Sequence, residues 1–164
     1  MAHFFKDIRL SFFDLIPLLL IFIISLNGIS IIEISIISIN LHYIIVYFWV
    51  LRKPNSLGYG YIFLSGIIAD VLYGTPLGSN ALALLFVAGF ASYIRVVTVN
   101  ISLINDWVGF VPTVLFANFV YFFSLFFIDY PIDYMFLFKS SIFTLIFYPF
   151  MWGIFTLISN FMKR

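Results

Sequence analysis

Six long apolar runs, separated by short polar segments, constrain this chain more than any other feature. They lie at about residues 12–26, 40–51, 57–73, 76–97, 107–127 and 136–160. Most of them approach the roughly 20 apolar residues that a helix needs to cross a bilayer. With 64% hydrophobic and only 9% charged residues, the chain lacks the polar surface of a water-soluble domain. We therefore predict an all-α integral membrane protein, a single domain over residues 1–164 built as a polytopic bundle of six transmembrane helices.

The segment before the second run fits this pattern least well. Residues 29–39 place serines and Glu33 within a run of isoleucines, and neither the helical nor the strand period holds throughout. We expect an interfacial segment on the outer side, either a strand or a short helix, that leads into a short span.

Basic residues predict the orientation, because cytoplasmic loops of membrane proteins carry an excess of Lys and Arg. With six spans and both termini in the cytoplasm, only Lys139 falls outside. The other seven basic residues then lie on the cytoplasmic side: Lys6, Arg9, Arg52, Lys53, Arg95, Lys163 and Arg164. The basic start of the chain lacks a small-residue cleavage site, so we expect the first run to be a span and not a cleaved signal peptide.

A carboxylate inside the third run is the first candidate functional residue. Asp70 lies in the sequence GIIADVLYGTPLGSNALAL of residues 66–84, and an ionised Asp at the bilayer centre costs roughly 2.5–3.5 kcal/mol on insertion scales. Gly66 shares its helix face and would let another backbone approach closely. The pattern predicts Gly74 just past the third helix, Thr75 as an N-cap and Pro76 as the first position of the fourth helix.

Three roles for Asp70 stay open from the residues alone. The carboxylate can accept hydrogen bonds from free N–H groups at the start of the fourth helix, since helix N-termini attract anions. It can contact a partner within the membrane, or it can belong to a proton- or ion-coupled site. Arg95 is a poor ion partner, because it falls some 20 Å away, near the other end of the fourth helix.

The remaining polar residues predict structural roles. Asp14, Asn105 and Asp106 fit helix caps and dipole partners. Pro112 and Pro149 predict kinks in the fifth and sixth helices, tolerated where neighbours satisfy the freed carbonyls. Polar residues that fit contacts between helices are Ser140, Ser141 and Thr144.

Motifs for chemistry are absent from the sequence. There is no nucleophile elbow, phosphate loop or His-Glu-x-x-His motif, and the carboxylates are not clustered. His3 and His42 have no spacing that indicates a metal site, and a net charge of +1 gives no basic patch for nucleic acid. We therefore expect no catalytic residue, no metal, no cofactor and no nucleic-acid partner.

Two stretches of the chain resemble one protein family. Residues 47–54 (YFWVLRKP) and 66–83 (GIIADVLYGTPLGSNALA) look like MreD, the rod shape-determining membrane protein of bacteria. The resemblance extends over nearly the whole chain and includes the sequence YPFMW at residues 148–152, but departs at residues 29–39. Its signature positions, which imply fold or contact and not chemistry, are Gly66, Asp70, Gly74, Pro76, Leu77 and Gly78.

The resemblance implies a non-enzymatic, multi-pass scaffold of the cell-wall elongation machinery in the bacterial inner membrane. Such a protein binds an MreC-like single-span partner and links the MreB-type filament, directly or indirectly, to a wall glycosyltransferase and transpeptidase, with membrane lipids around it. The alternative is the substrate-binding membrane subunit of a vitamin-type uptake transporter. That function requires a polar pocket, which Asp70, Asn80, Thr113 and Asn118 would line.

Overall fold

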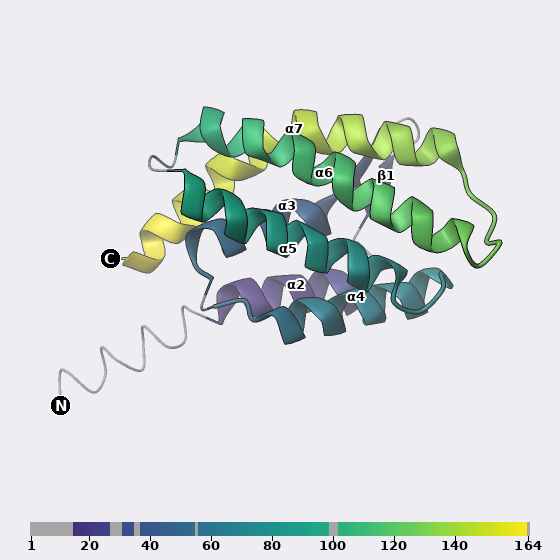
Figure 1. Cartoon of the computed structure of the whole chain (residues 1–164). Coiled ribbons are helices and arrows are strands. Elements are labelled where there is room, and N and C mark those ends of the chain that lie inside the picture. Colours follow the sequence, from purple (N-terminus) through teal and green to yellow (C-terminus); the bar gives the residue numbers. More distant parts are fainter. Residues whose placement is uncertain (1–14, 27–30, 35–36, 55, 99–101, 164) are drawn as a thin grey trace.

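The computed structural model describes residues 15–26, 31–34, 37–54, 56–98 and 102–163. Helices make up most of these residues (Figure 1). The elements are α2 (Ile16–Leu26), β1 (Ile31–Ile34), β2 (Ile37–Asn40), α3 (Leu41–Arg52), α4 (Tyr59–Tyr73), α5 (Ser79–Val97), α6 (Leu103–Phe126) and α7 (Tyr134–Lys163). The prediction of a helical protein is confirmed, with one short two-stranded hairpin that an all-α description leaves out.

Three of the described helices are long and apolar enough to cross a membrane. They are Ser79–Val97, Leu103–Phe126 and Tyr134–Asn160 within α7. The other three are apolar but shorter, with 11, 12 and 15 residues in α2, α3 and α4. At 1.5 Å per residue the shorter helices are roughly 16–23 Å long, less than the roughly 30 Å of a hydrocarbon core.

The isoleucine–serine segment forms an antiparallel β-hairpin. β1 pairs with β2 from Ile31 opposite Asn40 to Ile34 opposite Ile37, so a strand and not a short helix occupies the part of residues 29–39 that is described. β2 runs directly into α3 at Asn40, whose side chain accepts a hydrogen bond from the Tyr43 N–H (3.2 Å). The Asn40 N–H donates to the Thr144 hydroxyl on α7 (2.8 Å), so the hairpin is joined to the last helix.

Helix α3 is the core of the bundle. Every residue from Leu41 to Leu51 is buried, and α3 contacts α2, α5, α7 and β1. A helix that is apolar around its whole circumference is typical of a protein core or a membrane span, and here neighbouring elements bury it on all sides. Tyr47 packs against Phe110 of α6 and Tyr148 of α7, with ring centroids 4.9 and 5.8 Å away, which joins three helices at one level.

The outer faces of the long helices carry large apolar side chains. On α6, Phe116, Phe119 and Phe123 are between 45% and 57% exposed, and each ring lies about 6 Å from the next along the helix. A soluble monomer rarely exposes such a continuous apolar surface. This surface supports the membrane character that the sequence predicts.

Candidate functional site

The Asp70 carboxylate lies at the end of α4 and is fully buried. Its Oδ1 accepts hydrogen bonds from the Thr75 hydroxyl (2.8 Å), the Asn80 N–H (3.0 Å) and the Asn80 side-chain amide (2.9 Å). Its Oδ2 accepts one from the Gly78 N–H (2.8 Å). All four donors lie between residues 75 and 80, so the carboxylate ties the end of α4 to the start of α5.

This geometry matches the structural role that we considered for Asp70. The two backbone donors, Gly78 and Asn80, belong to the free N–H groups at the start of α5, which have no partner within the helix. A negative charge at this position also interacts favourably with the helix dipole. Because the carboxylate is enclosed by its own chain, a partner could reach it only if the turn opened.

The turn itself differs from the prediction in one respect. Gly74 ends α4 with φ +64°, and its N–H donates to the Asp70 carbonyl, so its predicted place is confirmed. However, α5 begins at Ser79 after Gly78, which has φ +100°, so it was wrong to place Thr75 as the N-cap and Pro76 as the first helical position. The physical reason is that the Thr75 hydroxyl is bound to Asp70, whose carboxylate takes the capping role.

Gly66 marks the closest approach of α4 and α5. A Cβ added there would lie 2.4 Å from the Ala81 Cα and 2.7 Å from the Ala81 N, so only glycine fits. This close approach confirms what the spacing of Gly66 and Asp70 predicts. At the end of the hairpin, the Tyr130 hydroxyl from the loop after α6 donates to the Gly74 carbonyl (3.2 Å).

The six signature positions therefore lie along one α4–α5 hairpin, which we call the Asp70 hairpin (residues 66–81). Gly66, Asp70, Gly74 and Gly78 have roles in backbone packing and hydrogen bonding. Leu77 differs, because its side chain is 70% exposed at the turn. Pro76, next to it, is half-buried.

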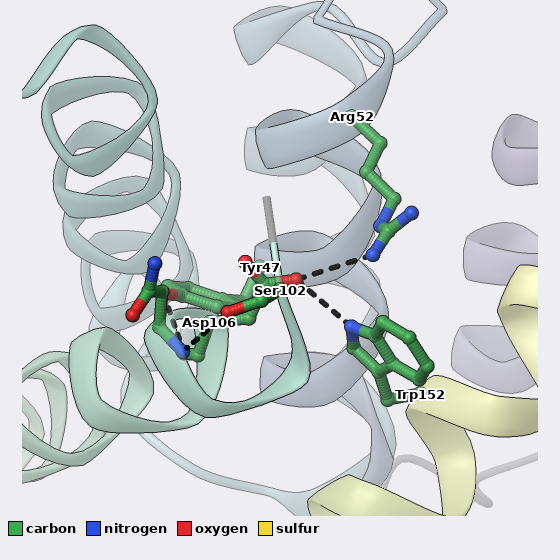
Figure 2. Close-up of polar contacts among 6 residues, drawn as sticks. Tyr47, Arg52, Ser102, Asp106 and Trp152 are labelled. Atoms are coloured by element: carbon green, nitrogen blue, oxygen red, sulfur yellow. Dashed lines mark hydrogen bonds and ion pairs between the residues drawn. The ribbon is translucent and has the colours of Figure 1, made fainter. Parts of the chain in front are cut away.

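A second polar cluster lies at the opposite end of the bundle, where α3 ends and α6 begins (Figure 1). Figure 2 shows its side chains. The buried Asp106 Oδ2 accepts hydrogen bonds from Arg52 Nη2 (3.2 Å) and Trp152 Nε1 (2.8 Å). The Tyr47 hydroxyl donates to the Asp106 carbonyl (3.0 Å). We call these four residues the Asp106 cluster; it joins α3, α6 and α7.

Sequence reasoning assigned Asp106 only a role at a helix start. Asp106 does lie in the first turn of α6, but the N-cap is Ser102, which accepts from the Asn105 N–H (3.3 Å). The ion pair with Arg52 was missed, because residues 54 positions apart meet only once the helices are arranged. The signal that could have found it is an acidic and a basic residue at the same predicted membrane level, with Trp152 nearby.

Aromatic rings surround the Arg52 guanidinium. Its Cζ lies 4.7 Å from the Phe48 ring centroid and 5.0 Å from that of Trp152, which is within cation–π range. The Arg52 side chain is 17% exposed and the Asp106 side chain 2%. Desolvating both charges costs free energy that the ion pair and the neighbouring donors offset.

The kink predicted at Pro149 has a specific partner. Proline has no N–H, so the carbonyl of Leu145 loses its normal partner four residues on. The Trp107 indole Nε1 donates to this carbonyl (2.9 Å). Adjacent residues of α6, Asp106 and Trp107, thus hold α7 on both sides of Pro149.

The polar residues expected to line a transporter pocket do not converge. Asp70 and Asn80 bind each other, Asn118 donates to Ser141 (2.6 Å), and the Thr113 hydroxyl donates to the Gly109 carbonyl within its own helix. The bond from Asn118 to Ser141 confirms the contact between helices expected of Ser141, whereas Thr144 accepts from Asn40 of β2.

His42 is a packing histidine. It is buried, and its Nε2 lies 2.8 Å from the Ser25 hydroxyl of α2. In the described part of the chain, no group of three or more His, Asp or Glu side chains could hold a metal ion. His3 and Asp14 lie outside the described residues.

Two surface concavities lie away from both polar clusters. A groove of about 610 Å³ runs along the outer face of α5, lined by Leu82, Leu85, Phe86, Gly89, Phe90 and Tyr93. A second, of about 630 Å³, lies at the start of α7 around Asp133 and Phe138. The groove on α5 is apolar throughout, like the surface of a lipid-facing helix.

Comparison with known proteins adds no relative. No family model matches the chain, and neither does any curated protein or solved structure. Assignment to a family therefore rests on the residues themselves.

Proposed function

We propose that this protein is a non-enzymatic membrane scaffold of the MreD type. It would hold an MreC-like single-span partner and so connect an MreB-type filament to the glycosyltransferase and transpeptidase of the cell-wall elongation machinery. The resemblance of residues 47–54 and 66–83 to that family is one support. The observation that carries the proposal is the Asp70 hairpin, whose buried polar groups bind one another and leave an apolar side chain, Leu77, at the surface.

A hairpin of this kind suits a contact surface better than a ligand site. The Asp70 carboxylate has four donors from its own chain, which fixes the turn in one conformation. Helices in lipid associate through close packing and polar contacts, not through a hydrophobic driving force. A rigid turn that presents Leu77 is therefore a suitable binding point for a partner helix.

The full topology belongs to the same proposal. We infer six spans with both termini in the cytoplasm of a bacterial cell, and an inner-membrane location. The arrangement supports this, because Arg52 and Arg95 end α3 and α5 at the end of the bundle where α6 begins. The loop with Asp129 and Tyr130 contacts Gly74 at the other end.

Cysteine labelling tests the topology, because the chain has no cysteine of its own. Single cysteines replace Ile128 and Val97, which are 58% and 61% exposed. We expect an impermeant maleimide to label the variant at position 128 in intact cells. The variant at position 97 should react only after the inner membrane is permeabilised, and the reverse pattern would contradict the proposed orientation.

Affinity purification of the full-length chain from its native membrane tests the scaffold role. We expect a single-span protein with an extracytoplasmic domain to co-purify, and Leu77→Asn to reduce its recovery. The matched control is Ile128→Asn, an exposed apolar residue at the same end of the bundle, which should leave recovery unchanged. Co-purification of ATPase subunits instead would identify a transporter component and overturn the proposal.

A further inference from the structure

Helix α7 has two halves that meet at Pro149. The halves point in different directions, with the C-terminal half turning away from α6 (Figure 1). Since proline cannot donate to the Leu145 carbonyl, α7 lacks one of its main-chain hydrogen bonds at this point. Trp107 replaces the missing donor from outside the helix. A proline with a freed carbonyl is a common place for a helix to bend.

Different neighbours hold the two halves. Before Pro149, Ser141 and Thr144 bind α6 and β2 through hydrogen bonds. After Pro149, Trp152 donates to Asp106, and the buried Phe155 ring packs on α3. There it lies 5.3 Å from Phe48 and 6.3 Å from Trp49.

Unpartnered polar groups are concentrated on α3 and α7. In the described part of the chain, six buried side-chain atoms have no hydrogen-bond partner, and four of them are on these two helices. The four are Trp49 Nε1, Arg52 Nε, Tyr148 OH and Thr156 Oγ1. A buried donor without a partner disfavours the conformation that buries it. Three of these four atoms, on Trp49, Arg52 and Thr156, lie on α3 or on the second half of α7, so the conformation that packs these segments together leaves polar groups unsatisfied.

We propose that residues 150–163 form an arm that moves about Pro149, with the Asp106 cluster as its latch. The bond from Trp152 to Asp106, supported by Arg52, holds the arm against α3. When the latch is lost, the arm swings, and the unpartnered Thr156 hydroxyl of the arm and Trp49 indole N–H of α3 become accessible to other donors and acceptors. This inference rests on contacts within the chain and is independent of the proposed scaffold role.

The size of the movement follows from the helix geometry. Asn160 lies 11 residues beyond Pro149, which is about 16 Å at 1.5 Å per residue. A change of about 20° in the kink would move this end by about 5–6 Å. Spin-label distance measurements resolve such a shift.

The experiment uses the full chain in lipid nanodiscs, with pairs of cysteines carrying spin labels. One label replaces Phe119 on α6. Its partner replaces either Leu157 on the arm or Phe138 on the first half of α7; all three are exposed. The latch is removed by Asp106→Leu, or more gently by Trp152→Phe, which keeps an aromatic ring and serves if the first variant does not fold.

We expect loss of the latch to add a second 119–157 distance, displaced by about 4 Å because Leu157 lies 8 residues beyond Pro149, and to leave the 119–138 distance unchanged. Adding Pro149→Ala, which restores an N–H for Leu145, should remove the second distance. The proposal is overturned if the folded latch variants keep a single 119–157 distance. It is equally overturned if both pairs change together, because that would be general loosening of the bundle and not a hinge.

Discussion

Replacing Gly66 by alanine tests the contact on which the Asp70 hairpin depends. The added methyl group would lie 2.4 Å from the Ala81 Cα, roughly 1.1–1.6 Å closer than carbon atoms in ordinary contact. The opposing atoms are backbone, so no side-chain rotamer can relieve the overlap. Helices α4 and α5 must therefore separate at this level.

The expected loss of stability combines three terms. Overpacking costs about 1–3 kcal/mol, and a rigid opposing backbone favours the upper end of that range. Ala81 follows Asn80 directly, so separation of the helices also stretches the two hydrogen bonds from Asn80 to Asp70. Such bonds to a charged group are worth about 1.5–3 kcal/mol each, and stretching without breaking loses about 1–2 kcal/mol of this in total. Against this, alanine gains about 1 kcal/mol of helix propensity. We expect a net loss of about 2–4 kcal/mol.

Gly60→Ala is the matched control, because it is the same substitution in the same helix. A Cβ at position 60 has no atom within 4 Å, so this variant should be unchanged or more stable by up to about 1 kcal/mol. Unfolding in SDS-containing mixed micelles, followed by circular dichroism, compares the two. Equal midpoints for both variants would refute the close-approach argument.

A second-site test separates backbone overlap from side-chain overlap. Ala81→Gly removes only the Ala81 methyl group and leaves its Cα and N, which lie closest to position 66. It should therefore fail to restore the stability of Gly66→Ala. Restoration to the level of the unaltered chain would show that the methyl group, and not the backbone, makes the contact.

Three further substitutions address the polar contacts. Asp70→Asn should destabilise the protein by about 2–4 kcal/mol, because an amide cannot accept from all four donors. The control Asp129→Asn, in an exposed turn with φ +52°, should cost little. Equal SDS unfolding midpoints for the two variants would contradict the structural role of Asp70. Gly78→Ala should cost about 1–2 kcal/mol, since φ +100° is strained for any side chain, which thermal unfolding in detergent measures. Trp107→Phe leaves the Leu145 carbonyl without its donor and should cost about 1–3 kcal/mol, and an unchanged midpoint would show that another donor replaces the indole.

Local sequence signals predicted the parts of this structure that depend on neighbours in the chain. The apolar runs located the six described helices to within a few residues, and Gly74 was recognised because a left-handed residue after a helix favours glycine. The Gly66–Asp70 spacing predicted a close approach on that face. These features follow from periodicity and backbone conformation, which a short stretch of sequence is enough to predict.

Features that depend on competition between nearby groups were harder to predict. Thr75 has the residue type of an N-cap, but its hydroxyl is nearer to a buried carboxylate that accepts from several donors at once. The start of α5 therefore moves to Ser79. Residues 29–39 had the same ambiguity, since isoleucine-rich segments fit a strand or a helix, and pairing along the hairpin decided it.

Contacts between distant segments were not predicted. Arg52 was interpreted as an orientation signal and Asp106 as a helix-start residue. Each interpretation concerned one residue alone and predicted no contact between the two. Their ion pair depends on the arrangement of α3, α6 and α7, which no spacing encodes. Likewise, the kink at Pro149 was predictable, whereas its partner Trp107 was not.

The enclosure of α3 has a consequence for biogenesis. α3 precedes α5 and α7 in the chain, yet these two helices supply most of its contacts, so the innermost helix is synthesised before the helices that cover it. Until α6 and α7 are made, Arg52 lacks Asp106 and Trp152, and a short helix of twelve residues that ends in such a side chain is poorly retained by lipid alone. Chains stopped before α7 should therefore remain with the insertion machinery or be degraded, so that burial of the innermost helix reports completion of the protein.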